Sequence, residues 1–216
     1  MSKLWVIVLG TAVAAVVAAG LYLNLTSTDA GISQAMASDP DALVVEVAAD
    51  EHIIGDPNAP VTIVEYASLT CPHCAAFHTE ILPEVKKQLL DTGKARLVYR
   101  DFPLDQLALR ASALVRCALP LQRPAMLSLL FQTQATWARS QDPMGALTQI
   151  GRGVGMSEAA ANACLQDQTV LDKVIAQRLE GEQKYKVAST PSFIIGGKLY
   201  GGGLSVEQMV ELVTKG

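Results

Sequence analysis

A pair of cysteines three positions apart follows directly after a β-branched run, and this arrangement constrains the fold more than any other feature. Residues 61–68 read VTIVEYAS, which has the composition of a central strand. The Cys-Pro-His-Cys segment at 71–74 comes next, and residues 77–89 continue at helical spacing, although Pro83 is expected to bend or interrupt that helix. Because residues 95–103 predict a second strand, we expect a βαβ unit with both thiols where strand passes into helix.

The rest of the chain extends this unit into an α/β fold. A short first strand is predicted at 43–47, and residues 104–185 contain helical patterns separated by proline or glycine. Two more strands are predicted to turn at Gly196-Gly197, and Ser205 with Gln208 is placed for a capping box on the last helix. This order predicts a thioredoxin-like fold with a helical domain inserted at about 104–185.

The N-terminal segment predicts export. Residues 4–23 contain no charge and no proline, which is enough apolar chain to span a bilayer as a helix. Lys3 precedes this run and acidic residues follow it, so the positive-inside bias places the rest of the chain outside the cytoplasm. We expect residues 1–25 to be a signal-anchor, or alternatively a signal peptide cleaved near 35–37. A flexible tether at 26–42 and the folded domain at 43–216 follow.

Charge and cysteine content limit what the exported domain can bind. The formal net charge of −4 gives no basic face, so we expect no nucleic-acid partner. The four cysteines read as two specific pairs in a compartment where disulfides persist. A haem tether would need histidine immediately after Cys74, where the chain has Ala75. A zinc or copper site stays open, since Cys71, Cys74 and His78 could supply part of a ligand set.

Redox chemistry has positive support from the expected geometry. Cys71 at the start of a helix faces unpaired N–H groups and the positive end of the dipole, which favour the thiolate. Pro72 suits the first turn, and a protonated His73 would add a positive charge and a hydrogen bond to the Cys71 sulfur. A stabilised thiolate makes the disulfide a stronger oxidant. Cys74, one turn further on, should be more buried and less reactive.

The segments VTIVEYASLTCPHCAAFH (61–78) and VASTPSF (187–193), with the helical insertion between them, resemble the DsbA family of exported thiol:disulfide oxidoreductases. The resemblance extends from Gly55 to the C-terminus. It implies that Thr190-Pro191 forms a cis-proline loop that lies against the dithiol and pairs with bound peptide. It also implies that Glu65 is a buried acid that relays a proton to or from Cys74.

The resemblance assigns further residues and leaves alternatives open. Thr70 is expected to cap the active-site helix and to contact substrate. From the residues alone, Thr190-Pro191 could be an ordinary turn, and Glu65 could be a strand-edge glutamate that reaches solvent. Threonine at 190 differs from the valine of the best-known enteric oxidases and also occurs in isomerases and reductases of this fold. As in relatives with a second cystine, Cys117 and Cys164 are expected to form a structural disulfide, the alternative being two buried thiols.

The function implied by this resemblance is oxidation of reduced exported proteins in the bacterial cell envelope. We expect a monomer in the periplasm, anchored to the inner membrane by residues 4–23 and reoxidised by a quinone-linked membrane partner of the DsbB type. No bound organic cofactor and no metal are implied. An envelope reductase or isomerase with the same dithiol is one alternative, and a zinc- or copper-binding module is another from a different class.

Overall fold

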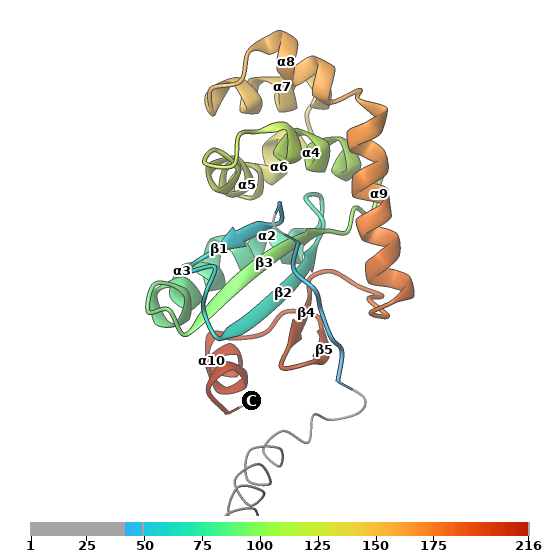
Figure 1. The fold of residues 1–216 in the computed structure, drawn as a ribbon. Coiled ribbons are helices and arrows are strands. Elements are labelled where there is room, and N and C mark those ends of the chain that lie inside the picture. Colours follow the sequence, from blue (N-terminus) through green and yellow to red (C-terminus); the bar gives the residue numbers. More distant parts are fainter. Residues whose placement is uncertain (1–41, 49, 216) are drawn as a thin grey trace, which may run out of the picture. The chain divides into compact units, whose positions relative to one another are not determined.

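A mixed sheet of five strands organises residues 42–48 and 50–215, which are the residues that the computed structural model describes (Figure 1). The strands lie in the order β1-β3-β2-β4-β5. Only β2 and β3 are parallel, and the other neighbours are antiparallel. The strands are β1 (His52–Ile54), β2 (Val61–Ala67), β3 (Ala95–Asp101), β4 (Ser192–Ile195) and β5 (Lys198–Gly201).

The central strand β2 is buried on both faces. Ile63 and Ala67 pack into the larger core, whereas Val64 and Tyr66 belong to a second cluster on the opposite face. This alternation follows from the two-residue period of a strand. It places Glu65 on the same face as Ile63, as the sequence predicts. The carboxyl end of β2 leads directly to the two thiols.

The helix that follows the dithiol is not a regular α-helix. It consists of α2 (Pro72–Ala76), a π-helical turn (Phe77–Ile81), α3 (Leu82–Val85) and a second π-helical turn (Lys86–Leu90). The expected interruption at Pro83 is confirmed, because a residue without an N–H group cannot continue an α-helical bonding pattern. The apolar spacing predicted for this segment still buries one face, which includes Phe77, Val85 and Leu89.

The insertion between β3 and β4 consists of helices joined by turns, with no strand in the described residues. Figure 1 shows α4 to α8 grouped on one side of the sheet, with α9 running back alongside it. Asp142 and Ser157 cap their helices through side-chain oxygens, as the sequence predicts. The helices are α4 (Gln106–Cys117), α5 (Arg123–Gln132), α6 (Gln134–Trp137), α7 (Pro143–Gly153), α8 (Glu158–Cys164) and α9 (Gln168–Gln183).

The C-terminal part agrees with its sequence pattern. Gly196 and Gly197 connect β4 to β5 with φ values of 57° and 75°, a left-handed conformation that glycine adopts without strain. The last helix, α10 (Val206–Lys215), begins in the predicted capping box. The Ser205 N–H donates to the Gln208 side chain, and the Gln208 N–H donates to the Ser205 hydroxyl.

The predicted strand at 43–47 is wrong. This segment has no regular secondary structure, and β1 occupies the sheet edge beside β3 instead. Its alternating apolar residues pack against the second core cluster, across the face of the sheet rather than along an edge. One backbone bond, from the Leu43 N–H to the Gly197 carbonyl at 2.7 Å, joins it to the β4–β5 turn.

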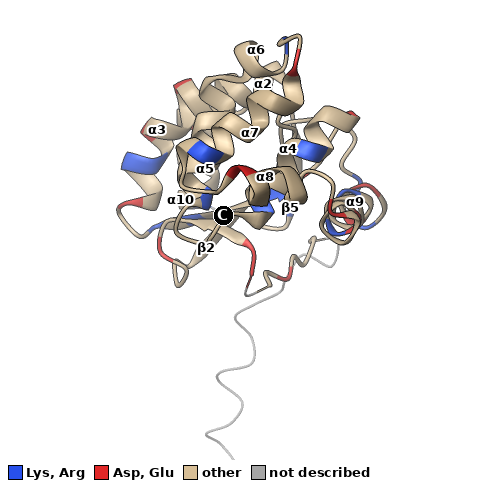
Figure 2. Ribbon diagram, turned by 90° about the horizontal axis from the view of Figure 1, so that it is seen from above, with Lys and Arg blue, Asp and Glu red and all other residues tan. Residues whose placement is uncertain are grey.

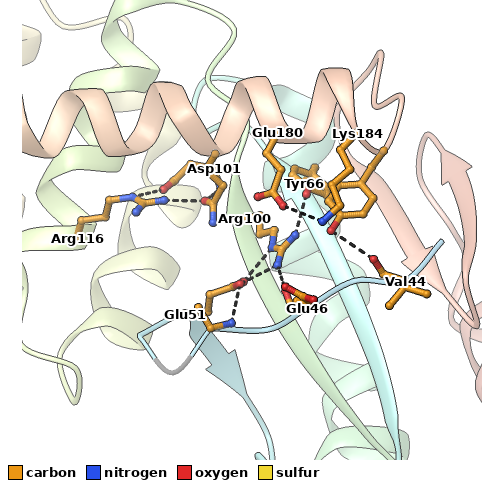
Figure 3. Close-up of polar contacts among 12 residues, drawn as sticks. Val44, Glu46, Glu51, Tyr66, Arg100, Asp101, Arg116, Glu180 and Lys184 are labelled. Carbon is orange, nitrogen blue, oxygen red and sulfur yellow. Dashed lines mark hydrogen bonds and ion pairs between the residues drawn. The ribbon is translucent and has the colours of Figure 1, made fainter.

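Arg100 of β3 holds this N-terminal segment in place (Figure 3). Its guanidinium donates to both carboxylate oxygens of Glu51 at 2.7 and 2.9 Å, and to the Glu46 carbonyl at 2.6 Å. It also donates to the Tyr66 hydroxyl at 2.9 Å. Arg100 is 2% exposed, so this fork of bonds satisfies a charge that would otherwise be costly to bury.

The thioredoxin-like fold with a helical insertion is therefore confirmed. The leader expected at 1–25, and the tether expected at 26–42 apart from its last residue, lie outside the described residues. Within the described ranges, no helix combines the length and the apolar character needed to cross a membrane. Acidic and basic residues alternate along the described chain, for example in α9 (Figure 2).

Candidate active site

Cys71 occupies the N-cap position of α2, where β2 passes into the helix. Its backbone is extended, and Pro72 takes the first helical position. The Cys71 thiol donates to the Thr190 carbonyl at 3.3 Å, which connects the dithiol to a loop far away in the sequence. Both Cys71 and Cys74 are free thiols here, so the structure shows the reduced form. Cys71 is 6% exposed and Cys74 is fully buried, so Cys71 is the more accessible of the two cysteines.

The surroundings of Cys71 favour its thiolate. They lower its pKa to about 5, and the largest contribution is a hydrogen bond from the Cys74 thiol. Burial acts in the opposite direction. The Thr190 side chain and the backbone N–H groups of Cys74 and His73 lower the pKa further. These amides belong to the first helical turn, where no partner exists within the helix. The predicted helix-end effect is therefore present.

Cys74 behaves in the opposite way although it lies only one turn away. It is completely buried. Three effects raise the pKa of Cys74. The largest is its hydrogen bond to Cys71, burial is the second, and the negative charge of Glu65 is the third. One sulfur is thus suited to be an anion and the other to hold a proton.

The Thr190-Pro191 loop lies against the dithiol, and its peptide bond is cis. The carbonyl of Thr190 faces the Cys71 sulfur. The Thr190 hydroxyl is buried and has no hydrogen-bond partner among the described residues. Because a thiolate accepts hydrogen bonds more strongly than a thiol, this hydroxyl is placed to stabilise the Cys71 anion.

Thr70 does not cap the active-site helix, and that prediction is wrong. With Pro72 at the first helical position, the cap falls on Cys71 instead. The Thr70 hydroxyl donates to Asp105 at 2.7 Å, and Asp105 also caps α4 by accepting from the Ala108 N–H. Thr70 therefore joins the active-site turn to the start of the insertion.

His73 and Pro72 lie on the exposed side of the first helical turn. Among the described residues, the His73 imidazole takes part in no hydrogen bond, so its expected bond to the Cys71 sulfur is not formed in this structure. The backbone N–H of His73 contributes in its place. Both residues lie next to Cys71 on the exposed surface of this turn.

Glu65 is fully buried, so the alternative of a strand-edge glutamate reaching solvent is wrong. Both of its carboxylate oxygens lie 3.0 Å from Nε2 of His78. The His78 side chain is only 4% exposed, and its ring stacks on Phe131 with the ring centres 4.0 Å apart. Sequence reasoning considered His78 only as a metal ligand. Its position at i+4 from Cys74 was the signal that could have placed it under the dithiol.

The helical insertion supplies another residue that sequence reasoning missed. The Gln134 side chain donates to the carbonyls of Leu69 and Cys71, at 2.8 and 3.0 Å, and is 7% exposed. These bonds fix the turn that carries the reactive sulfur. Nothing local in the sequence relates Gln134 to a turn more than sixty residues earlier.

Cys117 and Cys164 form a disulfide in the structure. Cys117 ends α4 and Cys164 ends α8, and their Cα atoms lie 6.3 Å apart. The bond lies within the helical insertion. In the described part of the chain, no group of three or more histidine, cysteine, aspartate or glutamate side chains is arranged to hold a metal ion.

Comparison with known proteins agrees with this geometry. The thioredoxin family pattern matches residues 48–215. A protein of Rickettsia felis named as a protein-disulfide oxidoreductase is 31% identical over 177 residues, which cover 82% of this chain and 63% of that protein. A similarly named protein of Rickettsia typhi is 33% identical over 68% of this chain. This chain spans between 55% and 63% of the length of these rickettsial relatives.

Solved structures extend the likeness to the whole described fold. The crystal structure of alpha-DsbA1 from Wolbachia pipientis is 27% identical with a TM-score of 0.72, and the match covers 79% of this chain and 92% of that one. BdbD from Bacillus subtilis, at 20% identity and a TM-score of 0.70, shares the fold over 81% of this chain and 97% of its own. The chain therefore belongs to the thioredoxin family, and within it resembles the DsbA-type thiol:disulfide oxidoreductases in sequence and fold.

Proposed function

We propose that this protein introduces disulfide bonds into reduced proteins of the bacterial cell envelope. One arrangement carries the proposal: Cys71 lies at the start of α2 against the Thr190-Pro191 loop, where its pKa is lowered to about 5, and the buried Cys74 holds its proton. A cysteine that is stable as an anion is a good leaving group and a poor reductant, so its disulfide tends to oxidise other thiols.

The reaction begins with the disulfide form of the enzyme. A substrate thiolate attacks Sγ of Cys71, the Cys71–Cys74 bond breaks, and Cys74 leaves and takes up a proton. A second substrate thiolate then attacks the substrate sulfur of this mixed disulfide. Cys71 departs as a thiolate and the substrate gains a disulfide. Two electrons pass from substrate to enzyme, which is left with one thiolate and one thiol.

The residues around the sulfurs have separate roles in this scheme. Thr190 stabilises the departing Cys71 thiolate through its hydroxyl, and the Thr190-Pro191 loop pairs with the backbone of the bound peptide. Glu65 relays the proton of Cys74. His73 and Pro72 border the bound peptide at the exposed turn. The Thr70 hydroxyl is bonded to Asp105, so Thr70 acts on the bound peptide indirectly, by fixing the active-site turn.

The cycle needs an electron acceptor, which the family resemblance assigns to a quinone-linked membrane protein of the DsbB type. We propose that the protein works as a monomer in the periplasm, and that residues 4–23 keep it at the inner membrane beside this partner. Anchoring in the same membrane would raise the effective concentration of the enzyme around its reoxidising partner.

Trapping of the reaction intermediate tests this function. Cys74→Ala removes the resolving thiol, so this variant should accumulate a mixed disulfide at Cys71 with a disulfide-bonded peptide. Wild type should oxidise a reduced, unfolded protein stoichiometrically, with each disulfide formed counted by mass spectrometry. Cys71→Ala is the matched control. It should form no mixed disulfide and should not oxidise the unfolded protein. Absence of both reactions in wild type and in Cys74→Ala would contradict the proposal.

The equilibrium with glutathione separates an oxidase from a reductase or isomerase that uses the same dithiol. An oxidase potential lies near that of the strongly oxidising members of the fold, about −120 mV, and a reductase lies near −270 mV. A metal-binding module would instead bind zinc or copper stoichiometrically and would not turn over peptide thiols.

A further inference from the structure

Cys74 must gain or lose a proton during the reaction although its side chain is buried. Cys74 and Glu65 have no exposed surface, so a proton that enters or leaves Cys74 must pass through a buried group. Glu65 alone would have to alternate between a buried charge and a neutral acid, and an unpaired buried charge is costly. The contacts of Glu65 therefore decide how the proton is held.

His78 provides those contacts. Its Nε2 atom lies 3.0 Å from both Oε1 and Oε2 of Glu65. Equal distances to the two oxygens are the geometry of an N–H group that donates to a carboxylate, whereas a protonated carboxyl group would use only one oxygen as donor. On this geometry we assign the proton to Nε2 and the acceptor role to Glu65.

The His78 ring is held rigidly in this position. It stacks on Phe131 with an interplanar angle of 19°, and it meets Phe77 and Tyr99 edge-on with ring centres 5.5 and 6.0 Å away. These rings come from the active-site helix, from β3 and from the insertion. A ring so enclosed cannot turn away from Glu65, which keeps the donor aimed at the carboxylate.

Two other titratable groups of the sheet, Tyr99 and His52, stay neutral around pH 7. Tyr99 of β3 lies opposite Glu65 in the sheet, and burial raises its pKa well above the usual value. His52 of β1 has its pKa lowered to about 4 by burial and by the charges of Arg123 and His78. Cys74 of α2 interacts electrostatically with Glu65, and Phe131 of α5 stacks on the His78 ring. Cys74 is therefore the group with which the pair is placed to exchange a proton.

We propose that His78 shares a proton with Glu65, and that the pair, rather than Glu65 alone, gives a proton to Cys74 when the disulfide breaks and takes it back when the disulfide re-forms. The inference rests on the proposed function. In the forward step, His78 begins as an imidazolium beside the Glu65 carboxylate. The Cys71–Cys74 bond breaks, one proton passes from the pair to the Cys74 sulfur, and His78 is left as a neutral ring until solvent restores the proton. His78 is thus a positioning and proton-sharing residue that acts through Glu65.

A set of glutamine substitutions tests this role. His78→Gln can still donate a hydrogen bond to Glu65 but cannot carry an added proton. We expect it to slow reduction of the oxidised enzyme by a peptide thiol at least about tenfold between pH 6 and 8 and to flatten the pH profile, since general acids typically contribute 10²- to 10⁴-fold. The pKa of Cys71, read by thiolate absorbance, should stay near that of wild type. His52→Gln is the matched control and should match wild type within twofold.

The double variant shows whether the two residues act as a unit. If they do, Glu65→Gln/His78→Gln should be no more than about twofold slower than the slower single variant, because residues of one relay are not additive. Rate losses that multiply in the double variant would overturn the proposal. So would a His78→Gln variant whose rates and pH profile equal those of wild type.

A measurement on the wild-type protein keeps the test independent of variants that fail to fold. A ¹H–¹⁵N correlation of the histidine rings should show a protected Nε2–H for His78, and an Nε2 without a proton from pH 5 to 8 would overturn the proposal. If wild type does not react with peptide thiols at all, the proposed function fails. If wild type reacts and His78→Gln behaves identically, only this inference fails.

Discussion

At the scale of single residues, two cysteines three positions apart have opposite acid–base character because one lies at a helix end and the other beneath it. The Cys71 sulfur receives the first-turn amides and the Thr190 hydroxyl, whereas Cys74 is buried near the negative charge of Glu65. The sequence predicts this contrast from Pro72 and the expected helix start. It does not predict Thr190 as a donor, because the loop reaches the site only through the fold.

The Thr190 hydroxyl supplies the first prediction. Thr190→Val keeps the shape of the side chain and removes the donor, so the pKa of Cys71 should rise by roughly one pH unit, given that a hydrogen bond to a charged group contributes about 1.5 kcal/mol or more. Thiolate absorbance near 240 nm measures the change. Thr190→Ser retains the hydroxyl and serves as control. Equal pKa values for Thr190→Val and wild type would show that the hydroxyl does not reach the sulfur.

At the scale of elements, the sequence predicts β2, the position of the dithiol, the helical block and the final ββα part. These elements carry strong local signals: β-branched runs, capping residues and a glycine turn. The strand predicted at 43–47 fails because alternating apolar residues also suit a segment that lies across a sheet face. The π-helical turns of 77–90 and the Glu65–His78 pair also escape prediction, since both depend on what packs against the helix.

The insertion provides the second prediction, which concerns its disulfide. Cys117 and Cys164 close a loop with a sequence separation of 47, and such a closure contributes up to about 4 kcal/mol in the chain-entropy model. Replacing both by alanine should lower the free energy of unfolding by about 2–4 kcal/mol, measured by urea denaturation. Oxidation of peptide thiols at 25 °C should continue, because neither cysteine touches the active dithiol. An unchanged unfolding midpoint would contradict the prediction.

At the scale of the whole molecule, the active site is shared between the sheet domain and the insertion. The sheet domain supplies the dithiol, Glu65 and the Thr190 loop, while the insertion supplies Gln134 and Phe131, which fix the turn and the His78 ring. Two segments separated in sequence therefore have to dock correctly before the site is complete. This explains why the sequence identifies the reactive residues but not the partners that position them.

Stability should depend on pH through Cys71. Its pKa falls from about 9 in the unfolded chain to about 5 in the folded, reduced protein. An acid with a depressed pKa adds stability that is complete above pH 9 and is lost as pH falls toward 5. Relative to Cys71→Ser, reduced wild type should gain stability from pH 5 to 9, at no more than about 1.4 kcal/mol per pH unit. Urea unfolding at several pH values checks this, and a constant difference would contradict it.

The most direct test of the whole account is the titration of the Cys71 thiol in the reduced protein, followed by thiolate absorbance and confirmed by the pH dependence of alkylation. The fold predicts a single transition with a pKa of about 5, with Cys74 remaining protonated through neutral pH. A transition near 9, the ordinary value for a cysteine, would contradict the claim that the helix end and the Thr190 loop stabilise this thiolate.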